Sequence, residues 1–228
     1  MKKYVNLFVF VFMIGACLSQ GRAQTKSAVS YKNPVVDIAM PDPTVIKAAD
    51  GYFYVYATES TRNVPIMKSK DLVEWTYCNT AFTNKTRPRF EPKAGIWAPD
   101  INYISGKYVL YYAMSVWGGE QTCGIGVATA DSPQGPFTDH GKMFRSNEIG
   151  VQNSIDPSLL QYEGRNYLVW GSFRGIYVIE LTADGLSIMP GAKKKRIAGT
   201  AFEAVYIHKY GDYYYMFASI GSCCQGVK

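Results

Sequence analysis

The sequence predicts an all-β protein built from repeated units of four strands, and three observations support this fold class. Aromatic residues make up 14% of the chain and fall in short runs such as YFYVYAT, YVLYYAMS and YYYMFAS, which are typical of half-buried strands. An internal repeat covers most of the sequence. Sustained helical periodicity is absent, which disfavours TIM-barrel and Rossmann folds. With 47% hydrophobic residues, the chain can bury a sizeable core.

The repeat consists of four similar segments, at residues 42–58, 100–115, 156–172 and 203–219. Each begins with a carboxylate, runs through a short apolar stretch, turns at a glycine and continues into an aromatic strand. A glycine between two such runs indicates a β-hairpin. The sequence therefore predicts the same hairpin four times.

A second landmark recurs in the same phase. Asp71, Asp131 and Asp184 each lie in a polar turn after a further strand, so each unit holds about four strands. Units of four strands that recur every 40 to 60 residues or so are typical of β-propeller blades. About three and a half blades are expected in this chain.

The N-terminal segment, residues 1–23, is predicted to be a signal peptide or a lipoprotein signal, because two lysines precede a short apolar stretch. Cys17 follows a sequence that resembles a bacterial lipobox, whereas Gly21-Arg22-Ala23 resembles an ordinary cleavage site. We therefore expect export, either as a periplasmic, outer-membrane or cell-surface lipoprotein anchored through Cys17, or as a secreted protein. Export permits disulfides, and the pairing of the other cysteines stays open.

Residues 30–228 are expected to form one domain. No later apolar stretch reaches the length of a membrane span and no linker divides the chain. The net charge of +6 is too small to indicate a nucleic-acid partner. A monomer is expected, with the membrane involved only through a lipid anchor.

The carboxylates that open the four repeats are the candidate functional residues. We expect Asp42, Asp100, Asp156 and Glu203 to occupy equivalent places in successive blades. Of these, Asp42, Asp156 and Glu203 open their strands directly, and we expect these three to converge at one end of the propeller channel. Glycoside hydrolysis needs two carboxyl groups, one that protonates the leaving oxygen and one that acts as base or nucleophile. A third carboxylate can tune the acid by charge repulsion.

These residues lie in motifs that together resemble glycoside hydrolase family 43, the five-bladed β-propeller enzymes that act on arabinans and xylans. The motifs, in family order, are MPDPTVI (40–46), GIWAPDI (95–101), GVATADSPQGPF (126–137), NSIDPSLL (153–160) and FEAVYI (202–207). The resemblance implies that Asp42 is the general base of an inverting reaction, Asp156 the pKa modulator and orienter, and Glu203 the general acid, kept protonated by Asp156 and burial. It also implies that residues 30–228 form the family's catalytic domain.

The candidate substrate-binding residues are an acid, two aromatic platforms and two hydrogen-bonding side chains. Asp100 is expected to support the site, and loop packing or a structural role is the alternative for all five. Neutral furanose rings offer C–H faces and hydroxyls, which suits aromatic and polar side chains. The five residues are Asp100, Trp97, Trp117, Asn153 and Ser172.

Within the family, NSIDPSLL, WGSFRGI (170–176) and FASIGSCCQG (217–226) are most similar to endo-1,5-α-L-arabinanases. The resemblance implies arabinan as substrate, with an α-L-arabinofuranosidase or β-xylosidase as alternatives. A non-catalytic glycan-binding propeller lipoprotein is the alternative of another class. The family leads us to expect a calcium ion in the channel, held by a histidine of the last blade, but that histidine has no counterpart here and no metal residue is assigned.

The length of the chain is short for the architecture. Five blades need roughly 250 residues or more, and the sequence ends within the fourth repeat. We expect the catalytic domain to be incomplete at its C-terminus, with exposed edge strands, and the 228-residue chain to be unstable or inactive by itself.

Overall fold

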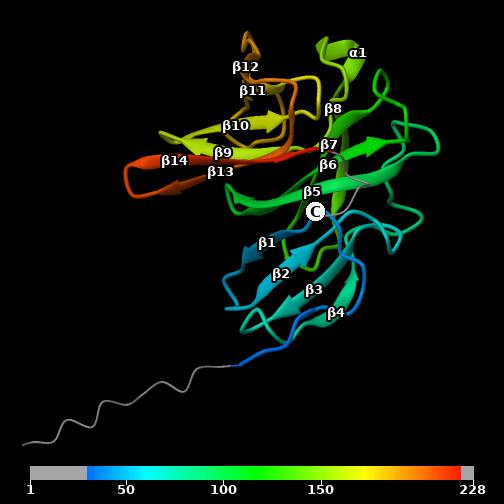
Figure 1. The fold of residues 1–228 in the computed structure, drawn as a ribbon. Coiled ribbons are helices and arrows are strands. Elements are labelled where there is room, and N and C mark those ends of the chain that lie inside the picture. Colours follow the sequence, from blue (N-terminus) through cyan, green and yellow to red (C-terminus); the bar gives the residue numbers. More distant parts are fainter. Residues whose placement is uncertain (1–29, 222–228) are drawn as a thin grey trace, which may run out of the picture. The chain divides into compact units, whose positions relative to one another are not determined.

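Fourteen strands and one short helix make up residues 30–221, the part of the chain that the computed structural model describes (Figure 1). Residues Lys32–Lys228 form one unit and Met1–Tyr31 another. The predicted signal segment, with Cys17, and the pair Cys223 and Cys224 lie outside the described residues. Cys78 and Cys123 are both free thiols. No described helix is long and apolar enough to cross a membrane.

The strands form three four-stranded sheets and one two-stranded sheet, each an antiparallel meander in chain order, which confirms the predicted all-β fold with about three and a half blades. The first sheet contains β1 (Thr44–Lys47), β2 (Phe53–Tyr56), β3 (Pro65–Ser69) and β4 (Thr76–Thr80). The second contains β5 (Gly95–Ile104), β6 (Lys107–Ser115), β7 (Gly124–Ala130) and β8 (Thr138–Arg145), which is followed by α1 (Ser146–Ile149). The third contains β9 (Ser158–Tyr162), β10 (Arg165–Trp170), β11 (Ile176–Glu180) and β12 (Lys195–Ala198). The fourth contains β13 (Phe202–Tyr210) and β14 (Tyr213–Ile220).

The predicted hairpin turns are present in all four sheets. The turn glycines Gly51, Gly106, Gly164 and Gly211 all have positive φ, a conformation that glycine adopts without the steric cost paid by other residues. The second landmark is confirmed as well, because its three aspartates lie between the third and fourth strands of their sheets. Asp71 shows why: its Oδ1 accepts hydrogen bonds from two following backbone N–H groups, which closes the turn.

The hydrophobic core lies between neighbouring sheets rather than within one of them. Tyr56, Phe82 and Tyr112 belong to a buried cluster between the first and second sheets. Trp170 belongs to the cluster between the second and third sheets, and its Nε1 donates to Ser154 Oγ at 3.1 Å. Burying a large apolar side chain contributes about 1.5 to 3 kcal/mol. Packing of one sheet on the next therefore fixes where the first strand of each sheet lies.

The first strands of the sheets lie next to one another, as Figure 1 shows for β1, β5, β9 and β13. β5 contacts β1 and β9, and β9 contacts β13. The two-stranded sheet packs on the third sheet through Val205 and its neighbours. Much of its apolar surface is exposed, including Phe217 (59%) and Ile220 (73%). Among the described residues, β14 has one partner strand, β13, and its other edge is unpaired.

Candidate active site

The strand register shows which residues occupy equivalent places at the N-terminal ends of the first strands of the four sheets. In β5, Trp97 faces Ala113 and Asp100 faces Tyr111, with a bulge between the two pairs. In β13, Glu203 faces Ser219 and Tyr206 faces Phe217, with a bulge at the equivalent place between the two pairs. A bulge adds one residue to one strand. Glu203 is therefore equivalent to Trp97, and the prediction that Asp100 is equivalent to the other acids is wrong.

Asp42 and Asp156 share the level of Trp97 and Glu203, because each precedes its strand by two residues and the hairpins have matching register. Asp100 lies two pairs deeper along the strands, at the level of Thr44 and Ser158. The sequence comparison paired Asp100 with the other three acids because the four repeat segments were matched residue by residue, and such a comparison cannot show the extra residue of a bulge. The end of the channel thus carries three acids and one tryptophan.

The backbone is left-handed at or beside each of these four positions. Asp42 has a φ of 50° and Asp156 a φ of 57°. In the two bulged strands it is the residue after the functional position, Ala98 at 40° and Ala204 at 52°. Left-handed non-glycine residues cost about 1 to 3 kcal/mol each and cluster at functional sites. The fold stores this strain where the side chains must point into the channel.

Asp42 is held by a hydroxyl at the end of β2. Thr58 Oγ1 donates to Asp42 Oδ2 at 2.5 Å and accepts a hydrogen bond from the backbone N–H of Ala98 at 2.7 Å. The carboxylate of the first sheet is therefore oriented against the bulge of the second. A donor to one oxygen leaves the other free to accept a proton.

Asp156 is the acid with the most perturbed protonation. Burial raises its pKa, the negative charges of Glu203 and then Asp42 raise it further, and the backbone N–H of Ala204 lowers it, with a net value of about 7. Like charges shift a pKa in this way only at short range. The three carboxyl groups therefore lie close to one another, and the pKa of about 7 keeps a proton on Asp156 up to near neutral pH.

Glu203 is fixed by the third sheet as well as by its own. Ser172 Oγ donates to Glu203 Oε2 at 3.1 Å, and the two residues form an isolated antiparallel bridge. Asn153 Nδ2 donates to the Ser172 carbonyl at 3.0 Å. Ser172 is 2% exposed. In this structure Ser172 and Asn153, predicted to contact substrate, position the acid and its loop.

Asp100 links three sheets below the acids. Its side chain accepts hydrogen bonds from Asn102 Nδ2 (2.7 Å), the Leu159 backbone N–H (2.8 Å) and Thr44 Oγ1 (3.4 Å). Burial raises its pKa to about 6, and these three donors limit the rise. The carboxyl group is thus engaged by protein donors from β1, β5 and β9. Its direct contact with substrate stays a prediction.

The two predicted aromatic platforms lie against each other. The rings of Trp97 and Trp117 are 5.5 Å apart between centroids and inclined at 52°. Trp97 packs on Ala113, Cys123 and Ile155, whereas Trp117 is 80% exposed. A large exposed aromatic side chain beside a cluster of acids is suited to stack on a sugar ring.

Two sets of positioning residues were missed by the sequence reasoning. Thr58 stands at the same place in the repeat as Ser172, so the shared hydroxyl was a signal that could have found it. Arg174 donates to both carboxylate oxygens of Glu120 at 2.9 Å, which ties the loop of Trp117 to the loop of Ser172. No sequence signal joined these two loops, because the ion pair crosses from one sheet to another.

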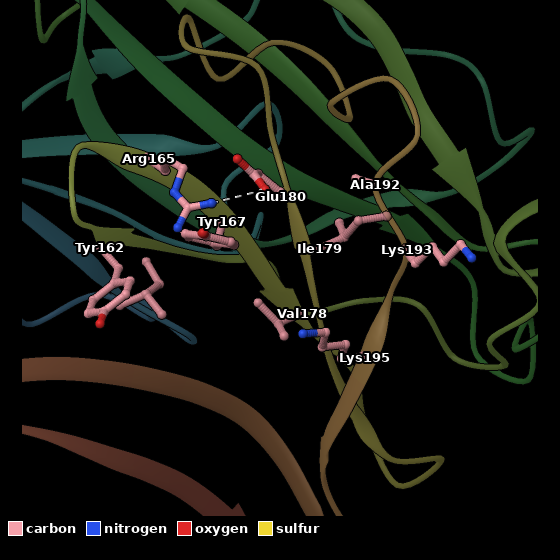
Figure 2. A pocket seen from close by; sticks show the side chains of 10 residues that line it. Tyr162, Arg165, Tyr167, Val178, Ile179, Glu180, Ala192, Lys193 and Lys195 are labelled. Atoms are coloured by element: carbon pink, nitrogen blue, oxygen red, sulfur yellow. Dashed lines mark ion pairs between the residues drawn. The ribbon is translucent and has the colours of Figure 1, made fainter.

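One cavity lies away from the acids. It has a volume of about 490 Å³ and lies on the third sheet (Figure 2), where Arg165 pairs with Glu180 at 3.7 Å. None of the three converging acids lines it. Within residues 30–221, no three His, Cys, Asp or Glu side chains are placed to hold a metal ion, so the calcium expected from the family is given no ligands here.

The fold and the site together define a class of protein, a β-propeller whose channel end carries the carboxyl groups of a glycoside hydrolase. The family model of glycosyl hydrolases family 43 matches residues 31–228. The chain belongs to this family, as the sequence motifs predicted.

Three relatives place the chain more narrowly. The extracellular endo-α-(1→5)-L-arabinanase 1 of Bacillus subtilis is 36% identical over 200 residues, which cover 82% of this chain and 61% of that protein. The solved structure of the Cellvibrio cellulosa α-L-arabinanase complexed with arabinohexaose has a TM-score of 0.72 and 28% identity, over 82% of this chain and 67% of that one. An exo-1,5-α-L-arabinanase from a bovine ruminal metagenomic library has a TM-score of 0.71 and 30% identity, over 86% and 70%. The chain spans about three fifths of the length of the first curated relatives that it matches.

Proposed function

We propose that the chain is the catalytic propeller portion of an arabinan endo-1,5-α-L-arabinosidase. The observation that carries this proposal is the convergence of Asp42, Asp156 and Glu203 from three sheets, expressed in the raised pKa of Asp156. Arabinan as substrate is supported by the arabinanases to which the chain is similar. The acids define the reaction, and the relatives indicate the sugar.

The reaction is a single displacement with inversion. Asp42 accepts a proton from a water molecule as the water oxygen bonds to the anomeric carbon. Glu203 gives its proton to the glycosidic oxygen as the bond from that oxygen to the anomeric carbon breaks. Thr58 holds the base through one oxygen, and Ser172 holds the acid through one oxygen. Exchange with solvent then restores both groups.

Asp156 acts on the acid rather than on the sugar. Its pKa responds to the charges of both Glu203 and Asp42, and electrostatic coupling is mutual. A negative charge on Asp156 therefore favours the protonated acid that the leaving group requires.

An exo-acting arabinanase is the second candidate, favoured by the likeness to the exo-1,5-α-L-arabinanase. The two modes share the acids and differ in the loops that flank the cleft. Product size separates them, because endo action on linear arabinan releases a range of oligosaccharides and exo action releases one short product. Export is part of the proposal, supported by the extracellular Bacillus relative; a lipid anchor at Cys17 remains the alternative to secretion.

The test compares the chain with its Glu203→Gln variant on linear arabinan and on an aryl arabinoside whose leaving group needs no protonation. In the complete protein that carries residues 1–228, we expect release of reducing ends from arabinan, a loss of at least roughly a hundredfold in the variant, and a much smaller loss on the aryl substrate. Asp131→Asn, at an acid that is 84% exposed, is the control. Arabinan binding without cleavage by the folded chain would contradict the proposal in favour of a glycan-binding propeller, and equal losses on both substrates would contradict the role of Glu203.

A further inference from the structure

A second cavity, of about 400 Å³, lies outside the acid cluster, and five of its nine lining residues are charged. Four of them are basic, and one acid shares the lining. Most of these residues belong to the segment between β4 and β5. They are Arg62, Arg87, Arg89, Lys93 and Glu91.

The acid and one arginine of the lining are already neutralised. Arg87 pairs with Glu59 through both of its terminal nitrogens, and Glu91 pairs with Arg145 at 2.5 Å. Arg62, Arg89 and Lys93 are exposed, and none of the three forms an ion pair with a described carboxylate. The cavity therefore presents three uncompensated positive charges.

Two of these charges are held in place. Arg62 Nε donates to Asn84 Oδ1 at 3.1 Å, and Arg89 Nη2 donates to the carbonyl oxygen of the same residue at 2.9 Å. Asn84 thus anchors both guanidinium groups and leaves their remaining N–H donors free. Donors fixed before binding lose less conformational entropy when an anion arrives.

The cavity lies beside the acid site. Glu59, which binds Arg87, follows Thr58, the residue that holds Asp42. Glu59 also accepts the backbone N–H of Ile96 at 2.9 Å, and Ile96 directly precedes Trp97. The lining of the cavity is thus joined to the acid site through Glu59 and its neighbours.

We propose that the cavity is a subsite for a carboxylate-bearing glycan strand, with Arg62, Arg89 and Lys93 contacting uronic-acid groups. Guanidinium groups recognise carboxylates through paired hydrogen bonds. The choice of a glycan among anions rests on the proposed function, whereas the anion site itself does not. The subsite adds to the site at Asp42, Asp156 and Glu203 the ability to hold an arabinan that is joined to an acidic polysaccharide.

The test measures binding of a galacturonic-acid hexamer to the complete protein that carries residues 1–228, by calorimetry at low salt. The variant Arg62→Gln, Arg89→Gln, Lys93→Gln is compared with Lys193→Gln, Lys194→Gln, Lys195→Gln, which removes the same charge from exposed residues after β11. Circular dichroism verifies that both variants are folded. We expect the first variant to bind the hexamer roughly tenfold more weakly and the second to bind within about twofold of the parent.

Two further measurements separate the explanations. Binding of a neutral arabino-oligosaccharide should be unchanged in the first variant, and this arm reports on the proposed function independently of the anion site. Equal weakening by both triple variants would overturn the proposal, since it would mean attraction by net charge alone. Inorganic phosphate that competes with the hexamer at equal concentration would overturn the assignment to a glycan.

Discussion

Replacing Asp156 with asparagine should stabilise the fold while it removes activity, and the gain should depend on pH. The pKa of this carboxyl group is raised from 3.8 to about 7 in the folded protein by burial and by the charges of Glu203 and Asp42. Between these two values the folded state binds more protons than the unfolded state, so stability falls as pH rises through this window. Well below pH 3.8 the acid is neutral in both states and costs nothing. Above pH 7 the cost is complete.

The magnitude follows from the shift. A difference of about 3 pKa units corresponds to about 4 kcal/mol. The Asp156 side chain is half-buried, and solvent screening reduces the charge repulsion, so we expect about 2 to 4 kcal/mol. Asparagine keeps an oxygen that accepts the N–H of Ala204 and cannot ionise.

The assay is urea unfolding of the chain and its Asp156→Asn variant, followed by tryptophan fluorescence at pH 4 and pH 8. The variant should be more stable by about 2 to 4 kcal/mol at pH 8 and within about 0.6 kcal/mol of the parent at pH 4. Asp131→Asn, at an exposed acid, should show no such pH dependence. A gain that is the same at both pH values, or absent at pH 8, would refute the convergence of the three acids.

Three further variants test how the site is held. Ser172→Ala removes the 3.1 Å hydrogen bond to Glu203, so kcat on arabinan should fall roughly fivefold with KM unchanged; an unaltered kcat would show that the bond does not position the acid. Trp117→Ala removes an 80% exposed ring, so KM should rise roughly tenfold while the free energy of unfolding stays within about 0.5 kcal/mol of the parent; an unchanged KM would remove Trp117 from the binding site. Gly171→Ala would place a Cβ 2.3 Å from the carbonyl oxygen of Gly175 at a φ of 130°, so thermal denaturation should show a loss of about 2 to 4 kcal/mol; a smaller loss would show that this loop can relax.

The sequence was sufficient for features that depend on local chemistry. Gly51 and Asp71 mark turns because a left-handed glycine and an Asx turn are determined by a few neighbouring residues. The convergence of Asp42, Asp156 and Glu203 followed from the repeat. Features that depend on register did not follow, because the bulge beside Ala98 shifts the strand without any mark in the sequence.

Contacts between sheets were also beyond the sequence. The pairing of Arg174 with Glu120 joins residues far apart in the chain, and the anchoring of Arg62 and Arg89 by Asn84 depends on the path of one loop. A run of residues shows that such side chains are polar. Only the packed sheets bring their ends together.

The bulge shared by β5 and β13 has a consequence for engineering. The same backbone conformation places the ring of Trp97 in one sheet and the carboxyl group of Glu203 in another. The backbone is therefore alike at the two positions, and only the side chains differ. The chemistry at these two equivalent positions then depends on which side chain occupies each of them. Trp97→Glu would place a fourth acid at a position whose equivalent in β13 already carries one. This position is therefore the natural place to seek a changed reaction on the same fold.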